Sequence, residues 1–335
     1  MTTAAILGTG AWGTTFAGVL GDAGNDVVLW GVEAPAVEEI NEFHTNAAFV
    51  GERVLPENVR ATLDPADALS DAELVVLALP AQHMRGIVAG FASLVPDDAL
   101  VVSLMKGIEV GTHMRMSEVL AEVWGVDDDR LVVVSGPNLA REIAEMQPTA
   151  TVVASRSESA AQSVADAMAS WYFRPYTNPD VVGVELCGAY KNVIAVAVGI
   201  ADGRGFGNNT TATIITRGLA EIQRLGLALG AAPETFAGLA GVGDLIATCS
   251  SSLSRNHSLG SHIGKGMSLE AAIRATDGTA EGAETSLSIR ELAHIAGVDV
   301  PICDAVVAML HEGGEVEAVM AALLSRPRKA EGEKR

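Results

Sequence analysis

Basic residues are scarce in this sequence. Lysine and arginine together number 22 against 42 aspartates and glutamates in 335 residues, so the formal net charge is −20. Such a surface repels nucleic acid and anionic membranes, and a negatively charged substrate then needs a local basic pocket. We therefore expect no nucleic-acid partner and no stable membrane association.

Cysteine is also scarce, and metal-ligand patterns are missing. The three cysteines, Cys187, Cys249 and Cys303, are odd in number and far apart, which argues against a disulfide framework and indicates a reducing compartment. We expect Cys187 and Cys303 to pack in the core and leave the place of Cys249 open. The histidines show no metal-ligand spacing, so no metal site is expected.

Long apolar runs are absent as well. No segment approaches the length of a transmembrane span, and the first residues enter a strand pattern without a basic segment or a cleavage-type signal. We expect a cytoplasmic protein. Because 49% of the residues are hydrophobic, the chain has enough apolar surface for the cores of two domains.

The order of the apolar runs predicts the fold class. Continuous apolar strands that alternate with helical patterns are typical of a doubly wound α/β sheet covered on both faces. The expected strands are 4–7, 26–30, 74–79, 99–104, 130–135, 149–155 and 172–177. Long helical segments follow, at 180–201, 208–230, 232–240, 268–276, 281–297 and 301–312.

These patterns divide the chain into two domains. A turn dipeptide at Asn178–Pro179 interrupts the pattern. We therefore predict an N-terminal Rossmann-type dinucleotide-binding domain over 1–178 and an all-helical C-terminal substrate domain over 179–335. The charged tail 326–335 is expected to fray.

A glycine-rich turn follows the first strand. Gly8, Gly10 and Gly13 have GxGxxG spacing between a strand and a helix, where the glycines allow a tight turn and a close approach to a pyrophosphate. Glu33 lies 20 residues after Gly13, just past the second strand, where a carboxylate can accept hydrogen bonds from a ribose 2′-hydroxyl. A glycine turn without a ligand is the alternative.

Further polar or loop residues follow other strands. Pro80 comes after the third expected strand, Lys106 after the fourth, and Gly136 and Asn138 after the fifth. Ligands of open α/β sheets bind beyond the carboxyl ends of the strands, so we expect these loops to converge on one site. Lys106 alone is also compatible with a solvated surface residue.

The helical half contains two unusual features. Lys191 and Asn192 stand inside an almost wholly apolar helix, and an ammonium group is costly to bury unless it is paired or loses its proton. In the segment 240–258, Arg255 and Asn256 offer donors that match phosphate oxygens. A lysine head that reaches solvent and an arginine in a simple salt bridge are the alternatives.

Taken together, these stretches resemble the NAD(P)-dependent glycerol-3-phosphate dehydrogenases of the bacterial type. The matching segments include GTGAWGT, NAAFV, MKGIE, SGPNLAREIA, CGAYKNVIAVAVGIADG and GDLIATC followed by SRN. The resemblance implies interconversion of dihydroxyacetone phosphate and sn-glycerol 3-phosphate for phospholipid biosynthesis. A homodimer is also expected.

The resemblance also implies residue roles. Lys191 corresponds to the general base, which burial favours by lowering the pKa of a lysine. The positions that correspond to substrate contacts are Lys106, Gly136, Asn138, Asn192, Asp244, Thr248, Ser254, Arg255 and Asn256. Those assigned to the cofactor are Gly8, Gly10, Ala11, Trp12, Gly13, Glu33, Pro80, Lys106, Ala140, Arg255 and Glu281.

The sequence departs from the family pattern near the second strand. Val32 and Glu33 stand where basic residues are common, and a 2′-phosphate is repelled by a glutamate, so NAD is favoured over NADP. Cys187 replaces a usual glycine and Thr211 a frequent lysine.

Two other functions compete with this interpretation. One is another two-domain dehydrogenase with a lysine base, acting on a 3-hydroxy acid or a sugar-acid phosphate, and fold alone does not separate it. The other is a cofactor-binding sensor without turnover.

Overall fold

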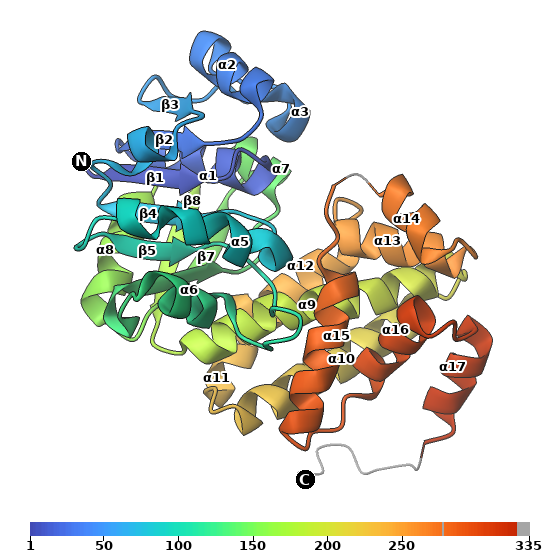
Figure 1. The fold of residues 1–335 in the computed structure, drawn as a ribbon. Helices are drawn as coiled ribbons and strands as arrows, with labels where there is room; N and C mark the ends of the chain where they lie inside the picture. The colour runs from blue at the N-terminus through green and yellow to red at the C-terminus, as the bar shows by residue number, and fades with distance from the viewer. Residues whose placement is uncertain (277, 327–335) are drawn as a thin grey trace.

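The structure is a computed structural model that describes residues 1–276 and 278–326. Its N-terminal half is built on one eight-stranded sheet, and its C-terminal half is helical (Figure 1). The predicted fraying of the tail concerns residues that lie almost wholly outside this description.

The sheet has the strand order β3-β2-β1-β4-β5-β6-β7-β8, and β7 runs antiparallel to β6 while the other pairs are parallel. The chain reverses its direction of winding between β1 and β4, which makes that point the topological switch. The strands are β1 (Thr3–Leu7), β2 (Asp26–Trp30), β3 (Val59–Thr62), β4 (Leu74–Leu77), β5 (Leu100–Ser103), β6 (Leu131–Ser135), β7 (Thr149–Ala154) and β8 (Phe173–Asn178).

Both faces of the central part of the sheet are covered, which is why strands β1, β2, β4, β5 and β6 are apolar without strict alternation. In β1, Ala4 and Ile6 pack with α1, α2 and α8, whereas Ala5 and Leu7 pack with α4, α5 and α6. The bounds are α1 (Ala11–Asp22), α2 (Ala34–Phe43), α3 (Ala47–Val50), α4 (Pro65–Leu69), η1 (Ala81–His83), α5 (Met84–Val88), η2 (Ala89–Leu94), α6 (Met116–Trp124), η3 (Asp128–Arg130), α7 (Ala140–Ala144) and α8 (Glu158–Met168).

The helical half is organised around one central helix, α9 (Figure 1). Asp180 caps its N-terminus by accepting a hydrogen bond of 2.9 Å from the Gly183 N–H. The helices are α9 (Val181–Gly203), α10 (Asn208–Ala228), α11 (Pro233–Phe236), the π-helix η4 (Leu239–Gly243), α12 (Asp244–Ser250), α13 (Arg255–Gly264), α14 (Leu269–Ala275), α15 (Gly282–Ile295), α16 (Pro301–His311) and α17 (Val316–Leu324).

The expectation that no segment approaches a membrane span is wrong. The 23 residues of α9 are long and apolar enough to cross a membrane, with a mean hydropathy of 1.6, but 94% of this apolar stretch is buried inside the protein. Lys191 and Asn192 interrupt the apolar run but lower its mean hydropathy only slightly. The segments 233–250 and 255–264, bent by 50° where they meet, together are also long and apolar enough.

Several element boundaries differ from the sequence-based expectations. The short strand β3 and helix α17 were not predicted, and no helix was predicted over 244–264, where the structure forms α12 and α13. The single helix expected over 232–240 is divided into α11 and η4. All three cysteines are buried and unpaired, including Cys249. The division into domains after Asn178 stays a prediction.

Candidate active site

Lys191 lies in the middle of α9 and is 7% exposed. Its Nζ donates hydrogen bonds to Asp244 Oδ1 at 2.5 Å and to Thr248 Oγ1 at 2.7 Å, both from α12. The ammonium group therefore points into the protein, and the alternative of a head that reaches solvent does not describe this lysine.

Asp244 holds a second lysine on its other oxygen. Lys106 Nζ donates to Asp244 Oδ2 at 2.6 Å and to the Gly136 carbonyl at 3.0 Å. Asp244 is 1% exposed, so one buried carboxylate stands between two ammonium groups. If both lysines are charged, the cluster keeps one net positive charge, which attracts an anionic ligand or a developing alkoxide.

Burial lowers the pKa of Lys191 from its usual value to about 7. The Asp244 carboxylate opposes this change, and the positive charge of Lys106 adds to it. A lysine with a pKa near neutrality can take up or release a proton under ordinary conditions.

A chain of side-chain amides connects this cluster to α13 and α15. Asn192 Nδ2 donates to the Lys106 carbonyl at 3.3 Å, and Asn256 Nδ2 donates to Asn192 Oδ1 at 3.0 Å. Asn256 Oδ1 in turn accepts from the Gly282 N–H at 2.8 Å. These bonds fix Asn192 and Asn256 beside the lysines.

Glycines allow α13 to pack directly on α9. A Cβ at Gly260 would lie 2.1 Å from the Val196 carbonyl oxygen, and one at Gly199 would lie 2.1 Å from the His257 carbonyl oxygen. No larger residue fits this contact. The close approach sets the position of the α13 N-terminus.

Ser254 and Arg255 form that N-terminus. The Ser254 hydroxyl caps the helix by accepting from the His257 N–H at 3.2 Å, and Arg255 is exposed in the first turn. A helix N-terminus carries a partial positive charge, so Arg255 and the helix end attract anions together.

The glycine-rich turn after β1 fits a dinucleotide. A Cβ at Gly8 would lie 2.6 Å from the Ala78 carbonyl oxygen, one at Gly13 would lie 2.0 Å from the Gly8 carbonyl oxygen, and one at Gly10 would meet open space. No side chain caps the N-terminus of α1, which leaves its first N–H groups to a phosphate.

Two buried polar atoms of predicted site residues have no partner among the described residues. They are Trp12 Nε1, in the first turn of α1, and Asn138 Oδ1, in the loop after β6. Buried polar atoms are normally hydrogen-bonded, so these two also fit a site that a ligand completes.

The remaining predicted cofactor residues lie at different depths. Glu33 is exposed at the start of α2, and the Ala140 carbonyl accepts from Thr15 Oγ1 of α1 at 3.2 Å. Glu281 Oε1 accepts from the Ala81 N–H at 3.0 Å, next to Pro80, and burial raises the pKa of Glu281. The structure thus brings Pro80 and Glu281 together, whereas Glu33 lies apart from them, just after the end of β2.

Sequence reasoning missed one glycine of the site. A Cβ at Gly188 would lie 2.8 Å from Ser135 Oγ and 3.5 Å from Lys106 Cγ, so Gly188 makes room for the Lys106 side chain beside α9. A glycine three positions before Lys191 in an otherwise apolar helix was the available signal.

No predicted site residue lines a separate cavity of about 570 Å³, which lies between His113, α15 and the start of α16. Within residues 1–276 and 278–326, no group of three or more histidine, cysteine or acidic side chains is arranged to hold a metal ion.

Family comparisons match both halves of the chain. The model described as NAD-dependent glycerol-3-phosphate dehydrogenase N-terminus matches residues 3–161, and the corresponding C-terminus model matches residues 180–321.

Individual proteins match over nearly the full length. A glycerol-3-phosphate dehydrogenase [NAD(P)+] of Streptomyces griseus is 54% identical over 328 residues, covering 98% of both chains. One of Corynebacterium diphtheriae is 53% identical and covers 97% of this chain and 99% of its own. The crystal structure of a glycerol-3-phosphate dehydrogenase from Coxiella burnetii superposes with a TM-score of 0.92 at 33% identity, covering 97% of this chain and 99% of that one.

Proposed function

The chain belongs to the NAD-dependent glycerol-3-phosphate dehydrogenase family and is an NAD(P)-dependent oxidoreductase that acts on a CH–OH group, and from this premise we propose how its own residues perform the reaction. The proposal rests on one observation, the buried arrangement in which Asp244 holds both Lys191 and Lys106. The two competing functions raised by the sequence have no comparable support.

Lys191 is the general acid and base. When it is neutral, its two N–H groups donate to Asp244 and Thr248, and its lone pair faces the remaining direction. In oxidation, that lone pair takes the proton of the C2 hydroxyl of sn-glycerol 3-phosphate. In reduction, the protonated Lys191 gives a proton to the alkoxide oxygen that develops on C2.

A bound nicotinamide cofactor would supply the hydride acceptor for oxidation at C2 and the hydride donor for reduction. Gly8, Gly10 and Gly13 would hold its pyrophosphate at the N-terminus of α1, with Ala11 and Trp12 in the first turn. Glu33 would accept hydrogen bonds from the ribose hydroxyls, and Pro80, Ala140 and Glu281 would contact the rest of the cofactor. No metal is needed in this scheme.

Lys106, Arg255 and the asparagines orient the substrate. Lys106 uses two of its three N–H donors on Gly136 and Asp244, and the third remains for a substrate oxygen. Arg255 and Asn256, at the α13 N-terminus with Ser254, bind the phosphate, and Asn138 and Asn192 complete the site.

The decisive experiment is the oxidation of NADH with dihydroxyacetone phosphate by the parent protein and by Lys191→Ala. Removal of a positioned acid or base should lower kcat by at least ~10²-fold. NADH affinity, measured by fluorescence titration, should stay within about twofold because Lys191 does not hold the cofactor. A parent protein that binds NADH without turnover would indicate a sensor, and normal turnover in the variant would remove Lys191 from the chemistry.

We propose further that the enzyme works in the cytoplasm as a homodimer, reduces dihydroxyacetone phosphate and supplies phospholipid synthesis. The family resemblance supports these points. Analytical ultracentrifugation of the parent protein tests the dimer. Depletion of the protein in its host tests the pathway, because labelled glycerol should then rescue phospholipid synthesis.

A further inference from the structure

Lys106 lies on a segment with little regular structure of its own. β5 ends at Ser103 and α6 begins at Met116, and between them the chain forms a short turn closed by an isolated bridge from Ile108 to Arg115 and by backbone hydrogen bonds of Glu109 with Met114 and His113. Loops of this kind move unless side chains hold them. The position of Lys106 therefore depends on the contacts of the segment 107–114, in addition to the hydrogen bond from Asn192 to its own carbonyl.

The two hydrogen bonds of the Lys106 ammonium depend on the position of its backbone. Asp244 attracts this ammonium at 2.6 Å, and Lys191, when it is charged, weakens that attraction by repelling Lys106. A shift of the Lys106 backbone would lengthen its hydrogen bonds to both Asp244 and Gly136.

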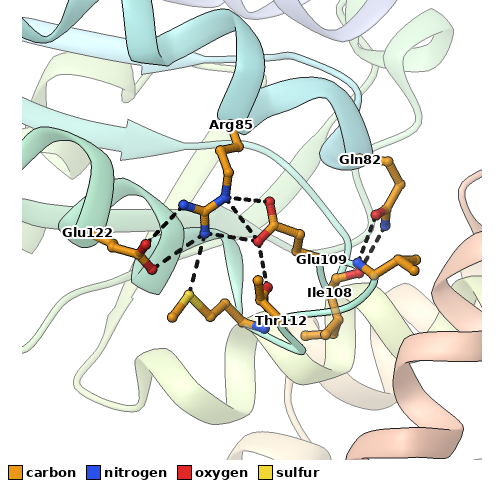
Figure 2. A network of polar contacts seen from close by, with 8 residues as sticks. Gln82, Arg85, Ile108, Glu109, Thr112 and Glu122 are labelled. Atoms are coloured by element: carbon orange, nitrogen blue, oxygen red, sulfur yellow. Dashed lines mark hydrogen bonds and ion pairs between the residues drawn. The ribbon is translucent and has the colours of Figure 1, made fainter.

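Gln82, in η1 at the end of β4, contacts the segment on both sides of Glu109. Its Nε2 donates to the Ile108 carbonyl at 2.9 Å, and its Oε1 accepts from the Val110 N–H at 2.9 Å (Figure 2). One side chain thus replaces the pair of backbone hydrogen bonds that a neighbouring strand would provide.

Arg85 binds the residue between these two contacts. Its Nε and Nη2 donate to the two oxygens of Glu109, each at 2.9 Å, and Thr112 Oγ1 donates to Glu109 Oε2 at 2.5 Å (Figure 2). Glu109 is only 8% exposed, and the Arg85 guanidinium lowers the pKa of its carboxyl. A partly buried ion pair with two parallel hydrogen bonds, like this one, is stronger than a surface ion pair.

We propose that Gln82 and Glu109 are positioning residues for Lys106: together with Arg85 they clamp the segment that follows it, so that the Lys106 ammonium stays on Asp244 and Gly136. This inference rests on the proposed role of Lys106 in the active site. Neither Gln82 nor Glu109 touches the substrate in this scheme, and both act through Lys106.

The chain offers a matched control. Arg85 also binds Glu122 on α6, with Nη1 to Oε1 at 3.1 Å, and Glu122 is exposed. Glu109→Ala and Glu122→Ala therefore remove the same group from the same arginine. Only the first loosens the segment of Lys106.

The experiment measures kcat and KM for dihydroxyacetone phosphate and NADH in both variants. Glu109→Ala should lower kcat/KM for dihydroxyacetone phosphate roughly 10- to 100-fold, as expected for a misplaced catalytic group, with KM for NADH within about twofold. Glu122→Ala should stay within about twofold of the parent in both kcat/KM for dihydroxyacetone phosphate and KM for NADH. Equal losses in the two variants would overturn the proposal.

A pH profile distinguishes positioning from general damage. Oxidation of glycerol 3-phosphate needs neutral Lys191, so kcat/KM of the parent should rise as the pH increases through about 7, the pKa to which burial lowers Lys191. Asp244, Lys106, Thr248 and Cys249 surround this lysine. If Lys106 is displaced, its charge lowers the pKa of Lys191 less. The rise in kcat/KM should therefore move to higher pH in Glu109→Ala and not in Glu122→Ala.

Two further variants keep the outcomes separate. Lys106→Met reports whether Lys106 acts in the site at all, and an unchanged kcat/KM there would overturn the proposed function together with this inference. If Lys106→Met is impaired while Glu109→Ala and Gln82→Leu match the parent, only the positioning role fails. If Glu109→Ala does not fold by circular dichroism, Gln82→Leu decides, with the same losses and the same pH displacement expected.

Discussion

Asp244 is the residue on which the active-site cluster depends. It accepts from Lys191 on one oxygen and from Lys106 on the other while being almost completely buried. Removing it would leave two unpaired ammonium groups in a place of low polarity, which costs several kcal/mol unless one of them loses its proton. This makes the aspartate as necessary to the proposed chemistry as the lysine that performs it.

Arg255 provides a prediction at the same scale. Arg255→Ala should lower kcat/KM for dihydroxyacetone phosphate by about 30- to 150-fold, because a charge-assisted hydrogen bond to phosphate contributes roughly 2–3 kcal/mol. Unphosphorylated dihydroxyacetone should show little change. Steady-state assays with both substrates measure the difference, and Arg274→Ala, which removes an exposed charge from α14, is the control. Equal losses with both substrates would assign Arg255 another role.

At the scale of elements, the contact between α9 and α13 positions the proposed phosphate site. A Cβ at Gly260 would overlap the Val196 carbonyl, so Gly260→Ala should push the helices apart and displace the α13 N-terminus. We expect a loss of about 1–3 kcal/mol in the free energy of unfolding, measured with urea, and a higher KM for dihydroxyacetone phosphate but not for NADH.

The control for this prediction is Gly90→Ala. Gly90 is exposed and a Cβ there meets open space, so this substitution should be neutral or slightly stabilising. If Gly260→Ala behaves like Gly90→Ala, the close packing does not position the phosphate site.

The prediction that NADH is preferred over NADPH rests on the residues that follow β2. Val32 and Glu33 are exposed there, and a carboxylate repels a 2′-phosphate by a few kcal/mol at an effective dielectric constant of about 20, so NADH should be preferred more than tenfold. Arg53 does not compensate, because it pairs with Asp22 at the far end of α1, roughly 16 Å along the helix from its start.

The measurement is kcat/KM for NADH and NADPH in the parent and in the double variant Val32→Arg, Glu33→Arg. The double variant should move the ratio towards NADPH. Glu52→Arg with Val54→Arg makes the same charge change at two other exposed positions and should leave the ratio unchanged. A parent that already prefers NADPH would show that Glu33 does not contact the ribose.

At the scale of the whole molecule, buried carboxylates join elements that are distant in sequence. Glu185 of α9 accepts from the Ser117 N–H at 2.8 Å and from Arg115 Nη1 at 2.7 Å, which ties the central helix to α6. Glu221 of α10 accepts from Tyr190 Oη and from the Ile302 N–H, each at 2.8 Å, and so caps the start of α16.

Glu221 makes the stability of the protein depend on pH. Burial raises its pKa to about 7 in the folded state, above the usual value near 4.3. The folded state then binds the proton of Glu221 more tightly than the unfolded state does. The stabilisation that Glu221 contributes is therefore complete below about pH 4.3 and is lost as the pH rises to about 7. The loss is at most about 4 kcal/mol.

Urea unfolding at pH 5 and pH 8 measures this effect. Glu221→Gln cannot ionise, so the parent should lose stability relative to this variant between the two pH values. Glu234→Gln, at an exposed carboxylate on α11, should change in parallel with the parent. An equal difference between parent and Glu221→Gln at both pH values would contradict the assignment.

The sequence alone determined seven of the eight strands and the glycine turn after β1. Each apolar run of the first half became a strand, because strands buried on both faces need continuous apolar residues, and that property is local. The glycine spacing after β1 and the burial of Lys191 were also visible locally. β3 was missed because VRAT is short and half polar.

Only the tertiary structure decided what those residues meet. Lys191 and Asp244 are 53 residues apart and Lys106 and Asp244 are 138 apart, and no local pattern records such pairs. Helix α13 was missed because RNHSLGSHIG has few apolar side chains. Its glycines bury backbone against the backbone of α9, so the partner that makes it a helix of the core lies outside its own sequence.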